Sequence, residues 1–322
     1  MLAGESRVND DIAQAAWLYY VGNLSQQEVS ERLGISRFKV LRMLADAREQ
    51  GLVRISVEHR TSSTLALADE LCARFGLEEA QVAPVSSDYD ADSEKYARDA
   101  VGILAARYMV RILSMEGAVT VGVGWGRTLS KMADHVSGVT KPDVTFVSIM
   151  GSVAHATHTA PGDVCVRLAA TTKGQAMLMP APFVTDSIAA CQTVMEQRLV
   201  KEALHTARKA DHAIMSLGEC RPGSILFESG IFTNEQQLEL QNARVVGDCC
   251  GVFFTADGTV ADIPLNDCTP CVRPDELAGM STVVLASGKR KLAATLAVLR
   301  AGFVKKLLID QTLARALLDQ VE

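Results

Sequence analysis

Apolar runs of strand length alternate with helical patterns from about residue 65 to the end of the chain. Alternation of this kind favours a parallel-rich sheet covered by helices on both faces. We therefore predict an α/β fold, in which ligands bind beyond the carboxyl ends of the strands. Strands are expected at 118–123, 144–149, 176–179, 213–217, 245–254, 282–286 and 304–309, and helices at 65–75, 94–113 and from about residue 128.

Length and composition fit an ordinary globular protein. A chain of 322 residues suits about two domains, and 48% hydrophobic with 22% charged residues excludes a disordered or fibrous class. No apolar stretch reaches the ~18 residues of a membrane span, and the N-terminus lacks a signal-peptide layout, so a cytoplasmic protein is expected. In that compartment the eight cysteines are expected to be packed thiols.

The first 60 residues carry the pattern of a helix-turn-helix. A first helix is expected at 11–20, and Ser25 opens a second one through a capping box. Gly34 marks a turn, after which Ser36 caps a third helix that Gly51 ends. The residues at 52–57 alternate and predict a strand or small wing.

Basic charge is concentrated in the second half of this segment. Residues 1–31 carry one positive and five negative side chains, whereas 32–60 carry seven positive and three negative ones. The second helix of such a motif enters the major groove, where arginine reads guanine and lysine or serine suits phosphates. The alternative is a three-helix packing element with a solvated basic face. The candidate DNA-binding residues are Ser25, Gln26, Ser36, Arg37, Phe38, Lys39, Arg42 and Arg54.

A glycine-rich loop at 122–128 lies between an expected strand and an expected helix. Closely spaced glycines let backbone N–H groups approach an anion, and a helix N-terminus adds a favourable dipole. The glycine spacing is not that of a dinucleotide site, and no Gly-Lys-Ser/Thr of a P-loop ends it. The loop is a candidate cradle for phosphate or sugar oxygens, with a tight packing turn as the alternative. Its candidates are Gly122, Gly124, Trp125, Gly126, Arg127 and Thr128.

Two further loops follow expected strands. Gly288 and Lys289 open a helix after an apolar strand, which makes Lys289 the first choice for a phosphate ligand among the cations at 289–291. Asp248, between glycines, either accepts hydrogen bonds from sugar hydroxyls or satisfies backbone amides. Arg167 is a candidate for the far end of the ligand, with a surface salt bridge as the rival explanation.

The cysteine and histidine patterns predict neither a metal site nor a cofactor. Cys268 and Cys271 have metal-ligand spacing, but a second such pair is missing and the first does not open a helix. His155 and His158 lie in an expected loop and either line the pocket or act in acid–base chemistry, with mobile loop histidines as the alternative.

The order of these motifs resembles the SorC family of transcription regulators, which is also grouped with central glycolytic and deoxyribonucleoside regulators. The match covers nearly the whole chain and rests on residues 24–53, 122–129, 246–251 and 286–310. The resemblance implies a winged-helix-like N-terminal domain and a Rossmann-like sugar-binding domain similar to glucosamine-6-phosphate deaminase and ribose-5-phosphate isomerase. It also implies tetramers on operator DNA. The chain departs from the family pattern at 266–273.

By position, the resemblance implies that residues 124–128 and Lys289 hold a phosphate while Arg167 and Asp248 line the sugar. We therefore expect a DNA-binding domain at 1–60, a linker at 61–64 and an effector and oligomerisation domain at 65–322.

The predicted function is a sequence-specific regulator of a carbohydrate or polyol catabolic operon. It is expected to act as a homo-oligomer, a dimer or tetramer, whose binding to double-stranded operator DNA is controlled by a sugar or sugar phosphate, with no membrane partner. The alternative is a sugar-phosphate isomerase or deaminase with an accessory domain. Because no carboxylate or histidine pair appears at catalytic spacing, we expect no enzyme.

Overall fold

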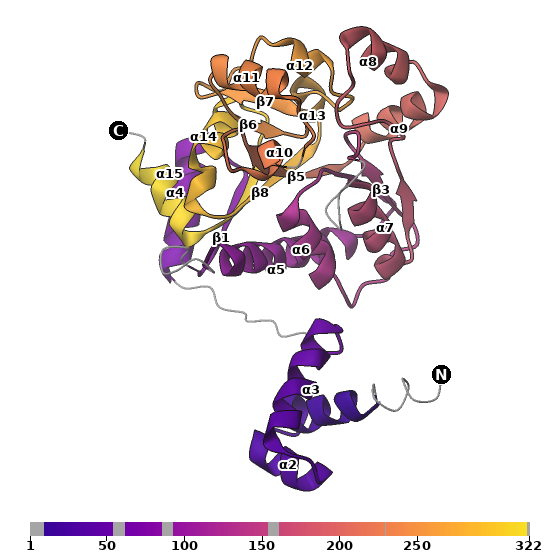
Figure 1. The fold of residues 1–322 in the computed structure, drawn as a ribbon, viewed down its shortest axis with the longest axis vertical. Coiled ribbons are helices and arrows are strands. Elements are labelled where there is room, and N and C mark those ends of the chain that lie inside the picture. Colours follow the sequence, from indigo (N-terminus) through magenta and orange to yellow (C-terminus); the bar gives the residue numbers. More distant parts are fainter. Residues whose placement is uncertain (1–9, 54–61, 86–92, 154–160, 229, 321–322) are drawn as a thin grey trace. The chain divides into compact units, whose positions relative to one another are not determined.

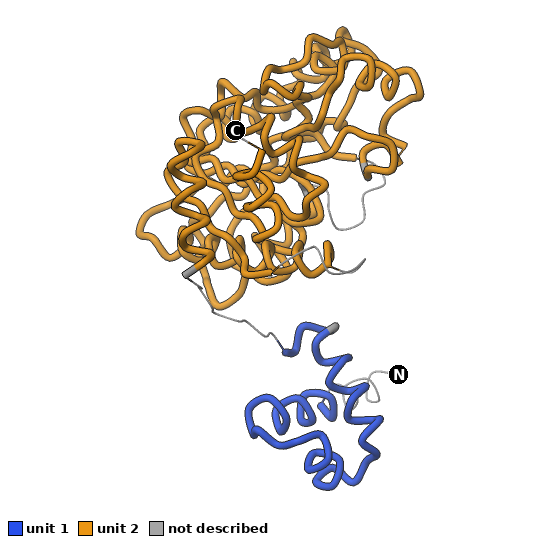
Figure 2. Tube along the Cα trace, turned by 90° about the vertical axis from the view of Figure 1, so that its left-hand side faces the viewer, with its two compact units in different colours: residues 1–58 blue, residues 59–322 orange. Residues whose placement is uncertain are grey.

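The computed structural model describes residues 10–53, 62–85, 93–153, 161–228 and 230–320. The chain divides into two compact units, residues 1–58 and 59–322 (Figure 2). Within the described ranges, no helix is both long and apolar enough to cross a membrane.

The N-terminal unit contains three helical segments around one small core. Residues 10–16 are helical and continue into a π-helical turn, η1 (Trp17–Val21), that ends at Gly22. Helix α2 spans Gln26–Leu33 and helix α3 spans Arg37–Glu49. The three predicted helices are therefore present, while the π-helical turn was not predicted. Their shared core is formed by Ile12, Ala15, Ala16, Leu18, Val29, Val40, Met43, Leu44 and Ala47.

Serine caps fix the beginnings of α2 and α3. The Ser25 hydroxyl accepts the Glu28 backbone N–H at 3.3 Å, and the Glu28 carboxylate accepts the Ser25 N–H at 2.7 Å. This is the predicted capping box. The Ser36 hydroxyl accepts the Lys39 N–H at 3.3 Å, and Gly34, at φ 64°, makes the turn between the two helices.

Two expectations concern the segment between the units. The predicted wing at 52–57 lies mostly outside the described residues, and so does Arg54. Helix α4 begins at Ser62, so the part of the expected linker at 62–64 is helical instead. Serine and threonine favour helix starts, and Thr64 is buried, which explains why a polar stretch that resembled a linker belongs to the helix.

The described part of the second unit is built on a nine-stranded sheet (Figure 1). Seven strands are parallel, in the order β1-β9-β8-β5-β2-β3-β4, and an antiparallel hairpin, β6–β7, extends from the end of β5. Their bounds are β1 Glu79–Ala83, β2 Val119–Val123, β3 Val144–Ser148, β4 Gln175–Met177, β5 His212–Glu219, β6 Val245–Cys249, β7 Val252–Thr255, β8 Ser281–Ala286 and β9 Lys306–Asp310.

Helices cover both faces of this sheet, as predicted for an α/β domain. Helices α5 (Ser93–Leu113), α6 (Arg127–His135) and α7 (Pro161–Thr172) bury one face. Helices α4 (Ser62–Phe75), α9 (Arg198–Arg208), α14 (Leu292–Arg300) and α15 (Gln311–Asp319) pack in the core of the other. The remaining short elements are α8 Ile188–Met195, α10 Ile225–Glu228, α11 Asn234–Asn242, α12 Pro264–Asp267, α13 Pro274–Leu277 and η2 Lys289–Lys291.

Two strand predictions differ from the structure. The apolar run at 245–254 was predicted as one strand, but it forms the β6–β7 hairpin, whose turn residues Cys250 and Gly251 have φ of 54° and 81°. Both arms are buried and apolar, so the segment was assigned to one strand although Asp248 and Gly251 interrupt it. Strand β1 was missed because Glu79 and Gln81 break its apolar pattern at the edge of the sheet.

Candidate functional site

A cavity of about 280 Å³ lies at the carboxyl ends of the adjacent strands β2, β5 and β8. Its walls come from four segments: the loop 125–128 after β2, residues 216–228 from the end of β5 onward, the loop 287–291 after β8, and the first turns of α5. The predicted location beyond the strand ends is thus where the structure has its cavity.

Only part of the glycine-rich loop lines this cavity. Trp125, Gly126, Arg127 and Thr128 do so, whereas Gly122 and Gly124 serve close packing. A Cβ added to Gly122 would lie 2.6 Å from an Ile149 methyl carbon, and one on Gly124 would lie 3.1 Å from the Cys250 sulfur. For Gly122 and Gly124, the structure therefore favours the packing alternative.

Gly126 is the residue immediately before helix α6 and determines the backbone conformation there. Its φ of 130° is disfavoured for other residues, and a Cβ there would lie 2.2 Å from the Ser216 hydroxyl oxygen. That hydroxyl donates a 2.7 Å hydrogen bond to the Trp125 carbonyl. Helix α6 begins at Arg127 without a side-chain cap, so the N–H groups of its first turn are available to an anion in the cavity.

Three cations of the described lining make no close ion pair. Arg98, Arg127 and Lys291 make no ion pair with any carboxylate in the described part of the chain. Burial lowers the Arg127 pKa and the nearby charge of Arg98 lowers it further, while the charges of Glu219 and Glu94 oppose this shift. Burial also lowers the pKa of Lys291, against the opposing charges of Glu219 and Asp248, and its ammonium group donates to the Leu217 carbonyl oxygen. Positive charge is therefore concentrated here at a cost in solvation, as in a site for an anion.

Two other cations of the lining are paired. Arg290 lies 3.0 Å from a Glu94 carboxylate oxygen, and Arg221 lies 2.8 Å from Glu219. The Arg290–Glu94 pair connects the loop after β8 to α5, and the Arg221–Glu219 pair neutralises two charges at the end of β5.

Asp248 lies behind the cavity wall and does not line it. Its carboxylate is buried against Gly218, where an added Cβ would be 1.9 Å from the Oδ1 atom, and it accepts the Gly251 N–H at 3.1 Å. Burial raises the Asp248 pKa to about 6, against the opposing effects of that hydrogen bond and of the Lys291 charge.

Lys289 lines a different cavity from the one at the ends of β2, β5 and β8. It lines a space of about 250 Å³ together with Arg315 and other residues of α15, whereas Lys291 lines the main cavity. Residues 289–291 form a 3₁₀ turn, in which side chains two positions apart point in different directions. Gly288, at φ 87°, donates its N–H to the Asp310 carboxylate at 2.6 Å.

Arg167 is occupied on α7. Its guanidinium lies 2.5 Å from Asp134 and 2.9 Å from Asp163, and it donates to the Ser130 hydroxyl at 2.9 Å. The structure does not bring it to the cavity, and the salt-bridge explanation describes its surroundings.

Sequence reasoning missed Glu94, Arg98, Arg290 and Lys291. The first two lie inside an ordinary helical pattern, and only the packing of α5 beside the strand ends brings them to the cavity. A signal for Lys291 existed, since it belongs to the cationic run 289–291, but the direction of each side chain did not follow from the run.

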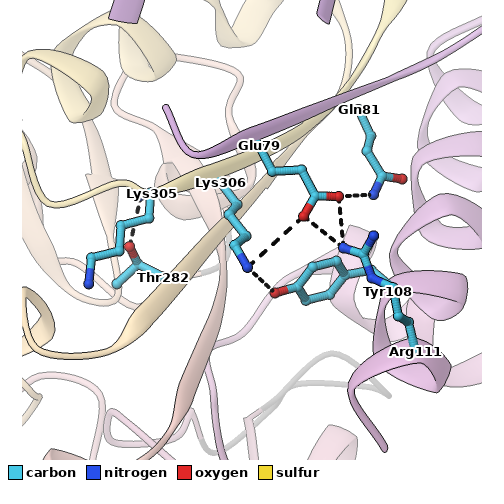
Figure 3. Close-up of polar contacts among 7 residues, drawn as sticks. All are labelled: Glu79, Gln81, Tyr108, Arg111, Thr282, Lys305 and Lys306. Atoms are coloured by element: carbon cyan, nitrogen blue, oxygen red, sulfur yellow. Dashed lines mark hydrogen bonds and ion pairs between the residues drawn. The ribbon is translucent and has the colours of Figure 1, made fainter. Parts of the chain in front are cut away.

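A second charged cluster lies at the opposite, amino end of the sheet. Figure 3 shows Arg111 and Lys306 converging on Glu79. Arg111 donates to both carboxylate oxygens at 2.7 Å, while Lys306 lies 4.0 Å from the carboxylate and donates to the Tyr108 hydroxyl at 3.3 Å. Partial burial opposes ionisation of Glu79, but hydrogen bonds from Arg111 and Gln81 outweigh it and lower the pKa.

The candidate DNA-binding side chains cluster on α3. Arg37, Phe38, Lys39 and Arg42 are exposed, as are Ser25 and Ser36 at the caps. Gln26, which is half-buried on α2, accepts a hydrogen bond from the Arg37 guanidinium at 3.3 Å. This bond links α2 and α3 at the point where α3 begins.

The remaining candidates from the sequence are a cysteine pair and two histidines. Cys268 and Cys271 are buried thiols, and the described residues contain no group of three or more cysteine, histidine or acidic side chains that could hold a metal ion. His155 and His158 lie outside the described residues.

Known proteins resemble this chain over both units. A family model described as a sugar-binding domain matches residues 59–319. The erythritol catabolism regulatory protein of Brucella abortus is 29% identical over 313 residues, which is 97% of this chain and 98% of that protein. The deoxyribonucleoside regulator of Bacillus subtilis is 30% identical over 311 residues, 96% of this chain and 97% of that one.

Solved structures show the same fold. A DeoR family transcriptional regulator from Listeria monocytogenes has a TM-score of 0.72 and 26% identity, covering 80% of this chain and all of that one. The full-length sorbitol operon regulator SorC from Klebsiella pneumoniae has a TM-score of 0.70 and 23% identity, covering 96% of this chain and 99% of that one.

Proposed function

The chain belongs to the SorC-type family of sugar-responsive transcription regulators, and from this premise we propose that a phosphorylated sugar or polyol in the cavity controls its binding to operator DNA. The relatives include regulators of erythritol catabolism and of deoxyribonucleosides, which suits a carbohydrate or polyol catabolic operon as the target.

The observation that carries the phosphate assignment is the set of cations around the start of α6 that make no close ion pair with a described carboxylate. Arg98, Arg127 and Lys291 supply positive charge, and the uncapped first turn supplies backbone donors. In this proposal Lys291 takes the role that the sequence analysis gave to Lys289. A cavity of about 280 Å³ is of the size that a small sugar phosphate needs.

The rest of the lining suits hydroxyl groups. Glu219, Glu228 and Ser224 offer oxygen acceptors to a polyol chain. Asp248 acts on the ligand indirectly, through the charge of Lys291 and the position of Gly218.

The N-terminal unit supplies the DNA contact. Its exposed α3 carries Arg37, Lys39 and Arg42 at the positions that enter a major groove, and the caps at Ser25 and Ser36 hold both helices of the motif. We place Arg54 on the DNA backbone as well, as the sequence suggested.

Control requires that the ligand bind two arrangements of the protein with different affinities, since equal affinities would shift nothing. We propose that ligand binding to the loops at 125–128 and 287–291 changes the geometry of a dimer or tetramer, and with it the spacing of the recognition helices.

A thermal-shift screen tests the ligand class. The panel contains tetrose, pentose and hexose phosphates, polyol phosphates and the matching unphosphorylated compounds, because a ligand that binds the folded state raises its apparent stability. The proposal expects a shift from a phosphorylated member and none from its unphosphorylated counterpart. Equal shifts from both would contradict the phosphate assignment.

The same compounds distinguish a regulator from an enzyme. Among the described residues no histidine lines the cavity, and Glu94 and Glu219 are held in ion pairs. Glu228 is then the one carboxylate of the described lining without an ion pair, so this lining offers no free pair of groups for acid–base chemistry on a sugar carbonyl. We propose that the chain has no isomerase or deaminase activity. Turnover of the stabilising compound by the purified protein would overturn this.

A further inference from the structure

Phe38 is the most exposed of the large apolar side chains that the structure describes, at 85%. A single apolar side chain on a surface needs no partner. Its position is what matters here, because Phe38 is the second residue of α3, the helix that we assign to the DNA contact.

The outward direction of Phe38 follows from the buried face of α3. Val40, Leu44 and Ala47 are buried in the core of the unit. At 100° per residue Phe38 lies on the opposite side of the helix, one turn before Arg42. A groove that receives the start of α3 therefore receives the phenyl ring and the Arg42 guanidinium together.

The surroundings of Phe38 favour nucleic acid over an apolar protein partner. Arg37, Lys39 and Arg42 flank it, all are exposed, and α3 has no acidic residue in its first turn. Such a basic rim complements phosphates. A phenyl ring cannot hydrogen-bond to base edges, and the apolar group that base pairs present in the major groove is the thymine 5-methyl.

We infer that Phe38 reads the 5-methyl group of a thymine in the operator, beside the base or phosphate contacted by Arg42. The inference rests on the proposed function, since it requires α3 to enter a major groove. It adds a specificity-determining contact whose chemistry is apolar, beside the exposed basic side chains of Arg37, Lys39 and Arg42.

The probe is a duplex selected from a random pool by the full-length protein. Each thymine is then replaced singly by uracil, which removes only the methyl group. For the unaltered protein we expect one position in each half-site at which this replacement weakens binding about tenfold. For Phe38→Ala we expect less than a twofold effect at the same position, because the contact is already lost.

Matched variants separate a readout contact from general damage. Val21→Ala truncates another exposed apolar side chain of the same unit, outside α3, and should keep the full uracil effect. Arg42→Ala should weaken binding while leaving the thymine-to-uracil ratio largely intact. Circular dichroism of each variant should match the unaltered protein, since Phe38 contributes nothing to the core.

The outcomes distinguish this inference from the function beneath it. Failure to enrich any duplex, or binding without salt dependence, would overturn the DNA-binding function itself. Sequence-specific binding with the same uracil profile for the unaltered protein and Phe38→Ala would overturn only the thymine readout. A lower oligomer mass for Phe38→Ala with unchanged DNA affinity would also overturn it, and would identify the ring as a contact between copies.

Discussion

Cations cluster at both the amino and the carboxyl end of the parallel sheet, but the two clusters differ in how they are paired with carboxylates. At the amino end, Arg111 and Lys306 share the carboxylate of Glu79. At the carboxyl end, Arg98, Arg127 and Lys291 surround a cavity and make no close ion pair with a described carboxylate.

This difference separates a structural cluster from a binding site. Charges that are already neutralised at close range have little to gain from a ligand, whereas partly buried, unpaired cations gain when an anion arrives. The contrast at one sheet, within one domain, is more informative than the number of basic residues at either end.

The largest expected effect is on ligand affinity. Replacing Lys291 by Met keeps the aliphatic stem but removes the charge. The affinity for the sugar phosphate found in the screen should fall about a hundredfold, since a hydrogen bond to a charged group contributes up to ~3 kcal/mol. Isothermal titration calorimetry measures this. Lys289→Met is the matched control and should leave the affinity unchanged, because Lys289 lines the other cavity. The reverse result would restore Lys289 as the ligand residue.

Asp248 gives a pH-dependent effect. Because its pKa is raised from 3.8 to about 6 in the folded state, this group stabilises the fold fully below its ordinary pKa, and the contribution is lost as the pH rises through about 6. Asp248→Asn should therefore be more stable than the unaltered protein at pH 7.5 by on the order of 2 kcal/mol, with a smaller difference at pH 5. Denaturant unfolding at both pH values decides this; a variant less stable at pH 7.5 would mean that the charge of Lys291 needs the ionised form.

A carboxylate introduced into the cavity should pair with its cations, as Glu79 pairs with Arg111 and Lys306 at the amino end of the sheet. Thr128→Asp places an acid at the first turn of α6 beside Arg127, and should abolish the response to the sugar phosphate because the new carboxylate pairs with the cations that would bind the ligand. Thr128→Asn is the uncharged control. A ligand response retained by the aspartate variant would show that the anion binds elsewhere.

The smallest effect is expected at the amino end. Glu79→Gln removes the shared carboxylate, but Arg111 is half exposed, so the loss should stay below about 1 kcal/mol at pH 7. Because the Glu79 pKa is lowered, the difference should shrink as the pH falls below 4.5, its ordinary value. Ligand affinity should not change. A drop in ligand affinity would contradict the assignment of the amino-end cluster to structure alone.

Local patterns identified most elements correctly and some of the site. The capping box at Ser25, the cap at Ser36 and the strand-loop-helix at 119–135 depend on neighbouring residues, so spacing alone located them. The hairpin at 245–255 was misjudged because burial of both arms hides the turn, and β1 was missed because an edge strand carries polar side chains.

The amino-acid sequence by itself determined the α/β architecture, the helix-turn-helix and the general position of the cavity, since these follow from periodicity, caps and the rule that strand ends carry the ligand. Only the tertiary structure decided which cations face the cavity. The direction of a side chain in a 3₁₀ turn separates Lys289 from Lys291, and the packing of α5 brings Arg98 to strand ends far away in the chain. Whether a cation has an acidic partner is likewise a property of the folded chain, because Glu79 meets Arg111 and Lys306 only after strands and helix have packed together.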